Sequence, residues 1–200
     1  MITIKSPREV ETMAAAGRIV AETAGAGRRG HVRPGVIHRG ARPHRRAVHP
    51  QPSRARSRRS RACYDFPATL CTSINQEVVH GIPSPKRILK EGDLLSVDVG
   101  VWLDGLHADS AATFPVLAVS PEAAKLLRVT QEALAAGITQ ARAGNHVGDI
   151  GHAGAAGGGR RRGIRWCGSW WGTVSGRVST RSPRCPTTAS PSGARASWPG

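Results

Sequence analysis

Two long stretches of this 200-residue sequence contain no acidic residue and no lysine. Residues 24–62 carry twelve arginines and residues 154–200 carry eight. The remainder is close to neutral, since residues 1–23 hold three basic and three acidic groups, and residues 63–153 hold six basic and ten acidic groups. The formal charge of +16 therefore comes from two blocks, and a nucleic-acid interpretation of that charge concerns only those blocks.

Long apolar runs and paired cysteines are also missing. There is no apolar run of about 18 residues, so the sequence predicts no membrane span. The N-terminus lacks the apolar core of a signal peptide, so we expect a cytoplasmic protein. The four cysteines form no C-x-x-C pair and no zinc-finger spacing, and we expect them to be reduced thiols. The length suits one domain.

The sequence is most informative at Leu94–Val116, which predicts two strands joined by a tight turn at Asp104-Gly105. If these two residues form the loop, the residue numbers of each directly opposed pair on the two strands sum to 209. Asp98 and Asp109 then lie on one face as diagonal neighbours, roughly 7–8 Å apart at the backbone. Their carboxylates could bridge two metal ions about 3.5–4 Å apart. The alternative is that both are ordinary exposed residues on a half-buried hairpin.

Three helices flank this hairpin in the prediction. Ser6, Pro7 and Glu9 form a capping box that begins a helix ending near Ala21–Thr23. Ser120-Pro121 begins a second helix, and Asn145–Ala153 begins a third. The second helix should end at Gly144 and bury a stripe that comprises Ala123, Leu126 or Leu127, Thr130, Leu134 and Ile138. Strands with helices place the chain in the α/β (α+β) class.

Several motifs, in order, resemble type I methionine aminopeptidases. They are the opening ITIKSPREVETMAAAGRIVAET, the island HVRPGV (His31–Val36), SINQEVVHGIPS (Ser73–Ser84), EGDLLSVDVG (Glu91–Gly100), DGLHADSAATFPV (Asp104–Val116) and GNHVGDIGHA (Gly144–Ala153). The resemblance implies the pita-bread fold, with an antiparallel sheet and helices. It also implies removal of the initiator Met from nascent polypeptides by a water that two metal ions activate.

The resemblance also implies roles for individual residues. Asp98 and Asp109 match two ligands of the metal pair, which is Co, Mn, Fe or Zn in the family. His80 matches a substrate-side histidine near the scissile peptide, although a lone His at such a junction is more often structural. Phe66 and Cys71 match the wall of the pocket for the Met side chain, and the alternative is that both belong to the core.

Three of the family's five metal ligands, one His and two Glu, have no counterpart. No acidic residue follows Asp149 and no histidine follows His152. A shifted reading frame would explain the two Arg-rich segments, and it supplies a G-H-G sequence near residues 172–173, where the missing His is expected. A permitted codon choice for Ile37–Gln51, read one nucleotide later, gives STAELDRIAEQFIR, a capped amphipathic helix. A choice for Trp166–Ala189, read two nucleotides later, gives VRELVGHGIGPGVHEVPQVPNYG, which resembles the family's next motif.

We therefore predict an incomplete domain over residues 1–153, disturbed and loop-like at 24–62, with a disordered tail at 154–200. As written, the chain should be inactive and unstable. Expected partners are the N-terminal Met of nascent polypeptides and the ribosome, with no membrane, no specific nucleic acid and a monomeric state. Two alternatives remain: a non-catalytic pita-bread binding protein, and an Arg-rich nucleic-acid-binding protein that uses residues 24–62 and 160–184.

Overall fold

The computed structural model divides the chain into two compact units, which we describe separately. The first comprises Met1–Val119 with Ser175–Ser179, and the second comprises Ser120–Val174 with Thr180–Gly200. The structure describes residues 4–26, 32–35, 55–56, 68, 70–158, 164, 171–174 and 181–186.

The first unit begins with helix α1, Pro7–Ala26, which starts at the predicted capping box. The backbone N–H of Ser6 donates to Glu9 Oε2 at 2.9 Å, and the backbone N–H of Glu9 donates to Ser6 Oγ at 3.4 Å. Two otherwise orphan donors are thereby satisfied at the helix start. The helix ends a few residues later than the sequence suggests.

The sheet of this unit is built around β3, Leu94–Leu103, and is antiparallel throughout. Strand β4, Leu106–Pro115, pairs with the whole of β3, while β2, Cys71–Ile74, and the short β1, Ala55–Arg56, pair with different parts of β3. Strand β1 falls within the segment predicted to be loop or disordered. The sheet and helices confirm the α/β (α+β) class.

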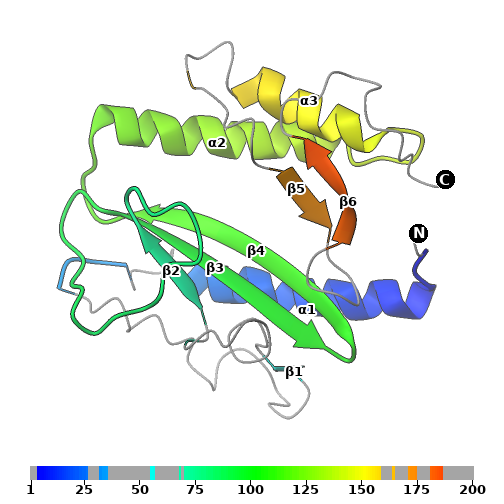
Figure 1. Ribbon diagram of the computed structural model, residues 1–200, viewed down its shortest axis with the longest axis horizontal. Coiled ribbons are helices and arrows are strands. Elements are labelled where there is room, and N and C mark those ends of the chain that lie inside the picture. The colour runs from blue at the N-terminus through cyan, green and yellow to red at the C-terminus, as the bar shows by residue number, and fades with distance from the viewer. Residues whose placement is uncertain are drawn as a thin grey trace. The chain divides into compact units, whose positions relative to one another are not determined.

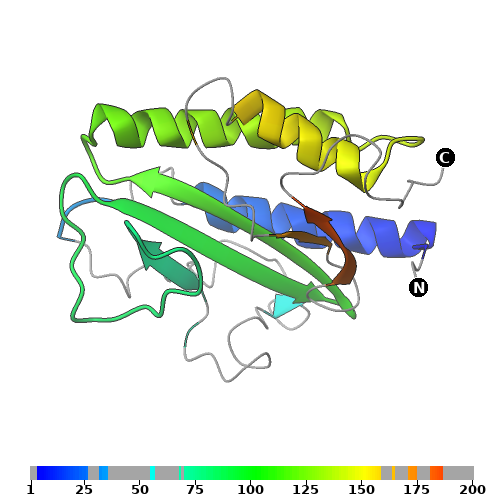
Figure 2. The same cartoon turned by 45° about the horizontal axis from the view of Figure 1, so that its top comes forward.

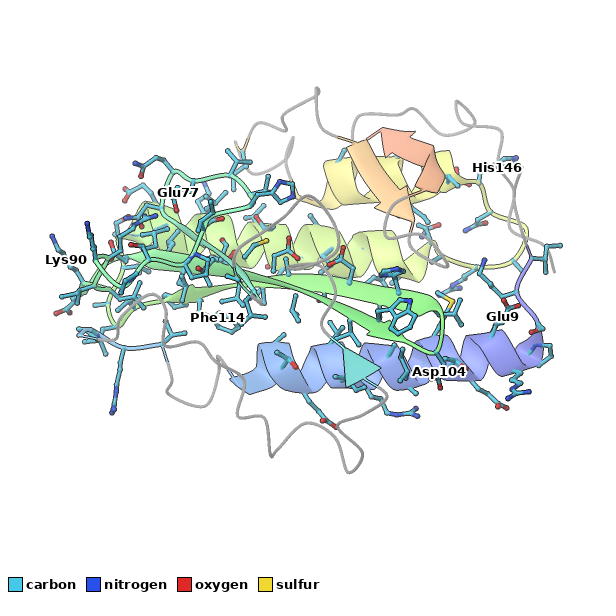
Figure 3. All side chains as sticks on the ribbon, turned by 60° about the horizontal axis from the view of Figure 1, so that its bottom comes forward. Glu9, Glu77, Lys90, Asp104, Phe114 and His146 are labelled. Carbon is cyan, nitrogen blue, oxygen red and sulfur yellow. The ribbon has the colours of Figure 1, made fainter. Side chains whose placement is uncertain are left out.

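The β3–β4 register is the one predicted, with Leu103 opposite Leu106 and every further pair in step. Asp104 and Gly105 form the loop with φ values of 45° and 87°, and Figure 3 shows Asp104 at the hairpin tip. Both values are positive, as a two-residue turn with the twist of the strands requires. The local preference of Asp-Gly has therefore fixed which side chains share a face.

Helix α1 covers one face of this sheet, and the core lies between them (Figures 1 and 2). Alternate residues of β3 point into this core and are between 2% and 6% exposed: Leu95, Val97, Val99, Val101 and Leu103. They pack with Ala16, Ile19 and Val20 of α1. Burial of these aliphatic groups is the main stabilising contribution of the unit.

The second unit contains α2, Pro121–Thr139, and α3, Val147–Gly158, which run side by side (Figures 1 and 2). Helix α2 begins as predicted, with Ser120 Oγ accepting a hydrogen bond from the Ala123 N–H at 3.1 Å. It ends at Thr139, before the predicted Gly144.

The predicted buried stripe of α2 is wrong. Leu126, Leu134 and Ile138 are 44%, 63% and 62% exposed, whereas the buried residues are Val129, Ala133 and Gly137. The reason is close helix packing: a Cβ added at Gly137 would lie 3.4 Å from Ile150 Cγ2, and one added at Gly154 would lie 3.5 Å from the Ala133 carbonyl oxygen. Small residues let the helices approach, and this close approach decides which face is buried.

The predicted boundary at residues 153 and 154 lies inside α3, which continues to Gly158. Gly154 packs against α2, so this glycine is accommodated within the helix despite its low propensity. Strands β5, Trp171–Val174, and β6, Arg181–Pro186, form an antiparallel pair within the predicted tail. Within the part of the chain that the structure describes, we find no helix with both the length and the apolar character that a membrane span requires.

Candidate active site

The sheet face opposite α1 carries a different set of side chains. Because directly opposed residues point to the same side, the two registers identify this set. It includes Cys71, Ser73, Ser96, Asp98, Thr113 and Asp109. One face of the sheet is therefore aliphatic, and the other presents hydroxyl, thiol and carboxylate groups.

Asp98 and Asp109 lie on this polar face, as the sequence predicts. Asp98 is opposite Ala111 and Asp109 is opposite Gly100, which makes the two aspartates diagonal neighbours. Asp98 is half-buried and Asp109 is exposed. Two carboxylates at this spacing provide hard oxygen donors of the kind that divalent cations bind.

These two residues do not by themselves fit a pair of metal ions. Within the described parts of the chain, no group of three or more His, Cys, Asp or Glu residues is arranged to hold a metal. Two carboxylates offer at most about four oxygens and no imidazole, while a metal pair needs a fuller shell. Asp98 and Asp109 could therefore supply only part of the ligand set that such a pair requires.

Cys71 directly faces Asp98 across the β2–β3 ladder and is only 7% exposed. The structure thus places this predicted pocket residue beside a predicted metal ligand, a proximity that the sequence spacing did not indicate. Phe66, the other predicted wall residue, lies outside the described residues.

His80 lies at the end of the loop that follows β2 and is exposed. Its φ of 59° is in the left-handed region, which histidine enters more readily than most residues. The next residue, Gly81, returns to β2: its carbonyl accepts from the Thr72 N–H at 2.9 Å, and its N–H donates to Ser73 Oγ at 3.1 Å. The backbone of His80 is therefore held beside β2, the strand that carries Cys71.

Two further polar contacts near these residues are missing from our sequence-based predictions, although the sequence carries a signal for one of them. The hydroxyls of Ser96 and Thr113 lie 2.8 Å apart on the polar face. Glu77 and Arg87 form an ion pair of 2.6 Å beside the His80 loop. The hairpin register already implied the first contact, since opposed numbers sum to 209. The second joins two loops, and no local pattern in the sequence indicates it.

The chain is similar to one protein family and to individual bacterial proteins. The model for "Metallopeptidase family M24" matches residues 11–160 of this chain. The methionine aminopeptidase of Clostridium acetobutylicum is 42% identical over 156 residues, which cover 76% of this chain and 60% of that relative. Methionine aminopeptidase 1 of Bacillus subtilis is 40% identical over 157 residues, with 76% and 60% coverage. The chain thus spans about 60% of the length of these relatives.

Solved structures with the same architecture include the methionine aminopeptidase of Thermotoga maritima. It superposes with a TM-score of 0.86 at 28% sequence identity, covering 100% of this chain and 78% of that chain. A prolidase from Pyrococcus furiosus has a TM-score of 0.69 at 15% identity, which is a likeness of fold alone. The predicted pita-bread fold is confirmed.

Proposed function

The chain belongs to metallopeptidase family M24, and we propose from this membership that its activity is that of a methionine aminopeptidase. The observation that carries the proposal is the pair Asp98 and Asp109 on one face of the β3–β4 hairpin, in a chain similar to methionine aminopeptidases. The reaction would be hydrolysis of the peptide bond after an N-terminal Met.

Each site residue has a proposed role within this activity. Asp98 and Asp109 would hold divalent metal, and the oxygen donors suit Co, Mn, Fe or Zn without selecting among them. His80 would lie near the scissile peptide and donate a hydrogen bond or carry a proton. Cys71 and Phe66 would line the pocket for the Met side chain.

We further propose that the chain as given binds metal weakly and hydrolyses little substrate. Support comes from the partial ligand set among the described residues and from the absence of acidic residues after Asp149 and of histidines after His152 in the sequence. Two shifts of reading frame, before Ile37–Gln51 and before Trp166–Ala189, would account for the arginine excess and for the missing His, which the second shifted frame supplies in its GHG sequence.

The proposed substrate is the initiator Met of nascent polypeptides, and the proposed location is the cytoplasm, where those polypeptides are made. The ribosome is a further candidate partner for the same reason. We also propose that the chain is a monomer.

The test compares the chain with a frame-restored variant. In that variant, residues 37–51 and 166–189 are replaced by STAELDRIAEQFIR and VRELVGHGIGPGVHEVPQVPNYG. The coding DNA is then read on in the restored frame past residue 189, far enough to encode the two missing Glu ligands. Hydrolysis of Met-Ala-Ser is measured with added Mn²⁺ or Co²⁺. We expect restoration to raise kcat/KM by roughly 100-fold or more, since lost metal ligands cost at least as much as lost residues around them.

A matched control carries Asp98→Asn in the restored variant and should lose this gain. Cleavage by the unmodified chain at a rate like that of the restored variant would refute the proposed inactivity. Failure of both proteins to release Met, with each shown to be folded by circular dichroism, would refute the aminopeptidase activity itself.

A further inference from the structure

The loop between β2 and His80 is closed by hydrogen bonds at both ends. At its start, the Asn75 N–H donates to the Leu94 carbonyl at 2.9 Å, and the Glu77 N–H donates to the Ile74 carbonyl at 3.1 Å. At its end, Gly81 bonds to β2, as described above. The loop therefore starts and ends at the same strand, β2, and His80 lies at its end.

The return at Gly81 is so close that it fixes the adjacent backbone. A Cβ on Gly81 would lie 2.1 Å from the Thr72 carbonyl oxygen, which no side chain could accommodate without backbone movement. His80 immediately precedes this contact and has a φ of 59°. Non-glycine residues hold such a conformation only where their surroundings impose it. The position of His80 therefore depends on whatever keeps the loop against β2.

Glu77, which is labelled in Figure 3, is the residue whose contacts keep the loop there. One carboxylate oxygen, Oε2, accepts from the backbone N–H of Ile74 at 2.8 Å, and the other, Oε1, accepts from Arg87 Nη1 at 2.6 Å. The side chains of Arg87 and Glu77 are 38% and 34% exposed, so solvent screens the pair in part. The carboxylate thus joins the end of β2, the His80 loop and the segment before β3.

Arg87 is itself held in place on its own segment. Its backbone N–H donates to the Ser84 carbonyl at 3.3 Å, and the Lys86 N–H donates to Ser84 Oγ at 3.2 Å. The guanidinium is therefore presented to Glu77 from a formed turn. Loops tied together at several points in this way open less often than free loops.

We propose that Glu77 is a positioning residue for His80 and that Arg87 is its partner in this task. The inference rests on the proposed function only for the use of His80 with substrate. Loss of the Glu77 carboxylate would release the loop at its start and let Gly81 leave β2, so that His80 no longer keeps its left-handed backbone. Neither Glu77 nor Arg87 needs to touch substrate for this effect.

Native-state amide hydrogen exchange of the full chain, followed by NMR, tests the proposal without any activity measurement. Glu77→Ala should speed exchange of the Thr72 and Gly81 amides about tenfold, since it removes both contacts. Glu77→Gln keeps an acceptor for the Ile74 N–H but loses the charge, and should speed exchange about threefold. Arg87→Met should match the Gln variant. The imidazole resonances of His80 should shift or broaden in the same order, while those of His146 stay unchanged.

Two control variants, Glu91→Gln and Lys86→Met, each remove one charge of the same sign at a nearby exposed position. Neither changes Glu77 or Arg87. Amides of the β3–β4 ladder report global unfolding and should keep their rates in every variant. Unchanged Thr72, Gly81 and His80 signals in Glu77→Ala would overturn the proposal, and so would equal acceleration across the β3–β4 ladder. A failed hydrolysis test would leave these exchange results intact, so the two proposals can fail separately.

Discussion

The two faces of the β3–β4 hairpin differ in what they contribute. The face toward α1 holds Val97, Val99 and Phe114 in the core, and Figure 3 shows Phe114 on the side of that helix. The opposite face holds Asp98 and Asp109. Along each strand, successive residues point alternately to the two faces, so each aspartate directly follows and precedes residues that point toward α1. Adjacent residues of one strand thus serve different purposes, one for stability and one for chemistry.

This comparison shows how a functional site can change without loss of the fold. Burial of apolar area stabilises the domain, while carboxylates on the other face are held by the same backbone and contribute little to its stability. A chain that loses some metal ligands can therefore keep its hairpin and its register. Three sets of substitutions test this division, and we take them from the largest expected effect to the smallest.

The largest effect should follow from an aspartate placed on the aliphatic face. Val99 is 2% exposed, so Val99→Asp would bury an unpaired carboxylate and cost at least about 3 kcal/mol. Domains of this size are stable by about 5–15 kcal/mol, so we expect this substitution to remove at least about a fifth of the unfolding free energy and to lower the urea midpoint accordingly. Urea denaturation followed by circular dichroism measures the change.

The matched control places the same residue on the polar face. Ala111 is exposed and lies opposite Asp98, so Ala111→Asp should cost no more than about 1 kcal/mol, from like-charge repulsion. Equal losses from the two substitutions would mean that the faces are not energetically distinct.

The second effect concerns metal affinity. We expect Mn²⁺ to bind the chain with a Kd of about 10⁻³ M, because two carboxylates form a weak site. Asp98→Asn and Asp109→Asn should each weaken binding about tenfold or more and change the unfolding free energy less than Val99→Asp does. Isothermal titration calorimetry measures the affinity.

Asp104→Asn is the control for charge, since Asp104 lies at the exposed hairpin tip with a φ of 45° that Asn also tolerates. It should leave Mn²⁺ affinity unchanged. If all three Asn variants bind Mn²⁺ alike, the polar face holds no specific site.

The sequence predicts the hairpin well because neighbouring residues alone determine its turn and its register. Asp104-Gly105 selects one turn, the turn selects the register, and the period of two then places Asp98 and Asp109 on one face. The helix starts at Ser6 and Ser120 follow from capping chemistry in the same way. Each of these predictions needs no knowledge of distant parts of the chain.

Features set by tertiary packing could not be predicted from local sequence. Leu134 and Ile138 fit a buried stripe by hydrophobicity, but close contact between α2 and α3 requires small residues and buries Ala133 and Gly137 instead. The contact between Glu77 and Arg87 depends on two loops meeting, which periodicity does not encode. The reading-frame interpretation stays a prediction that resequencing the coding DNA would decide.

The smallest effect should come from the Ser96–Thr113 pair, whose hydroxyls are 2.8 Å apart and partly buried on the polar face. Ser96→Ala and Thr113→Val should each cost about 1 kcal/mol, because each leaves the other hydroxyl without this partner. The double variant removes both groups and should cost less than the sum, which gives a coupling of about 0.5–1.5 kcal/mol by urea denaturation. Additive costs would mean that this contact contributes nothing. A coupling above about 2 kcal/mol would mean that the polar face also stabilises the fold, and the division between the two faces would no longer hold.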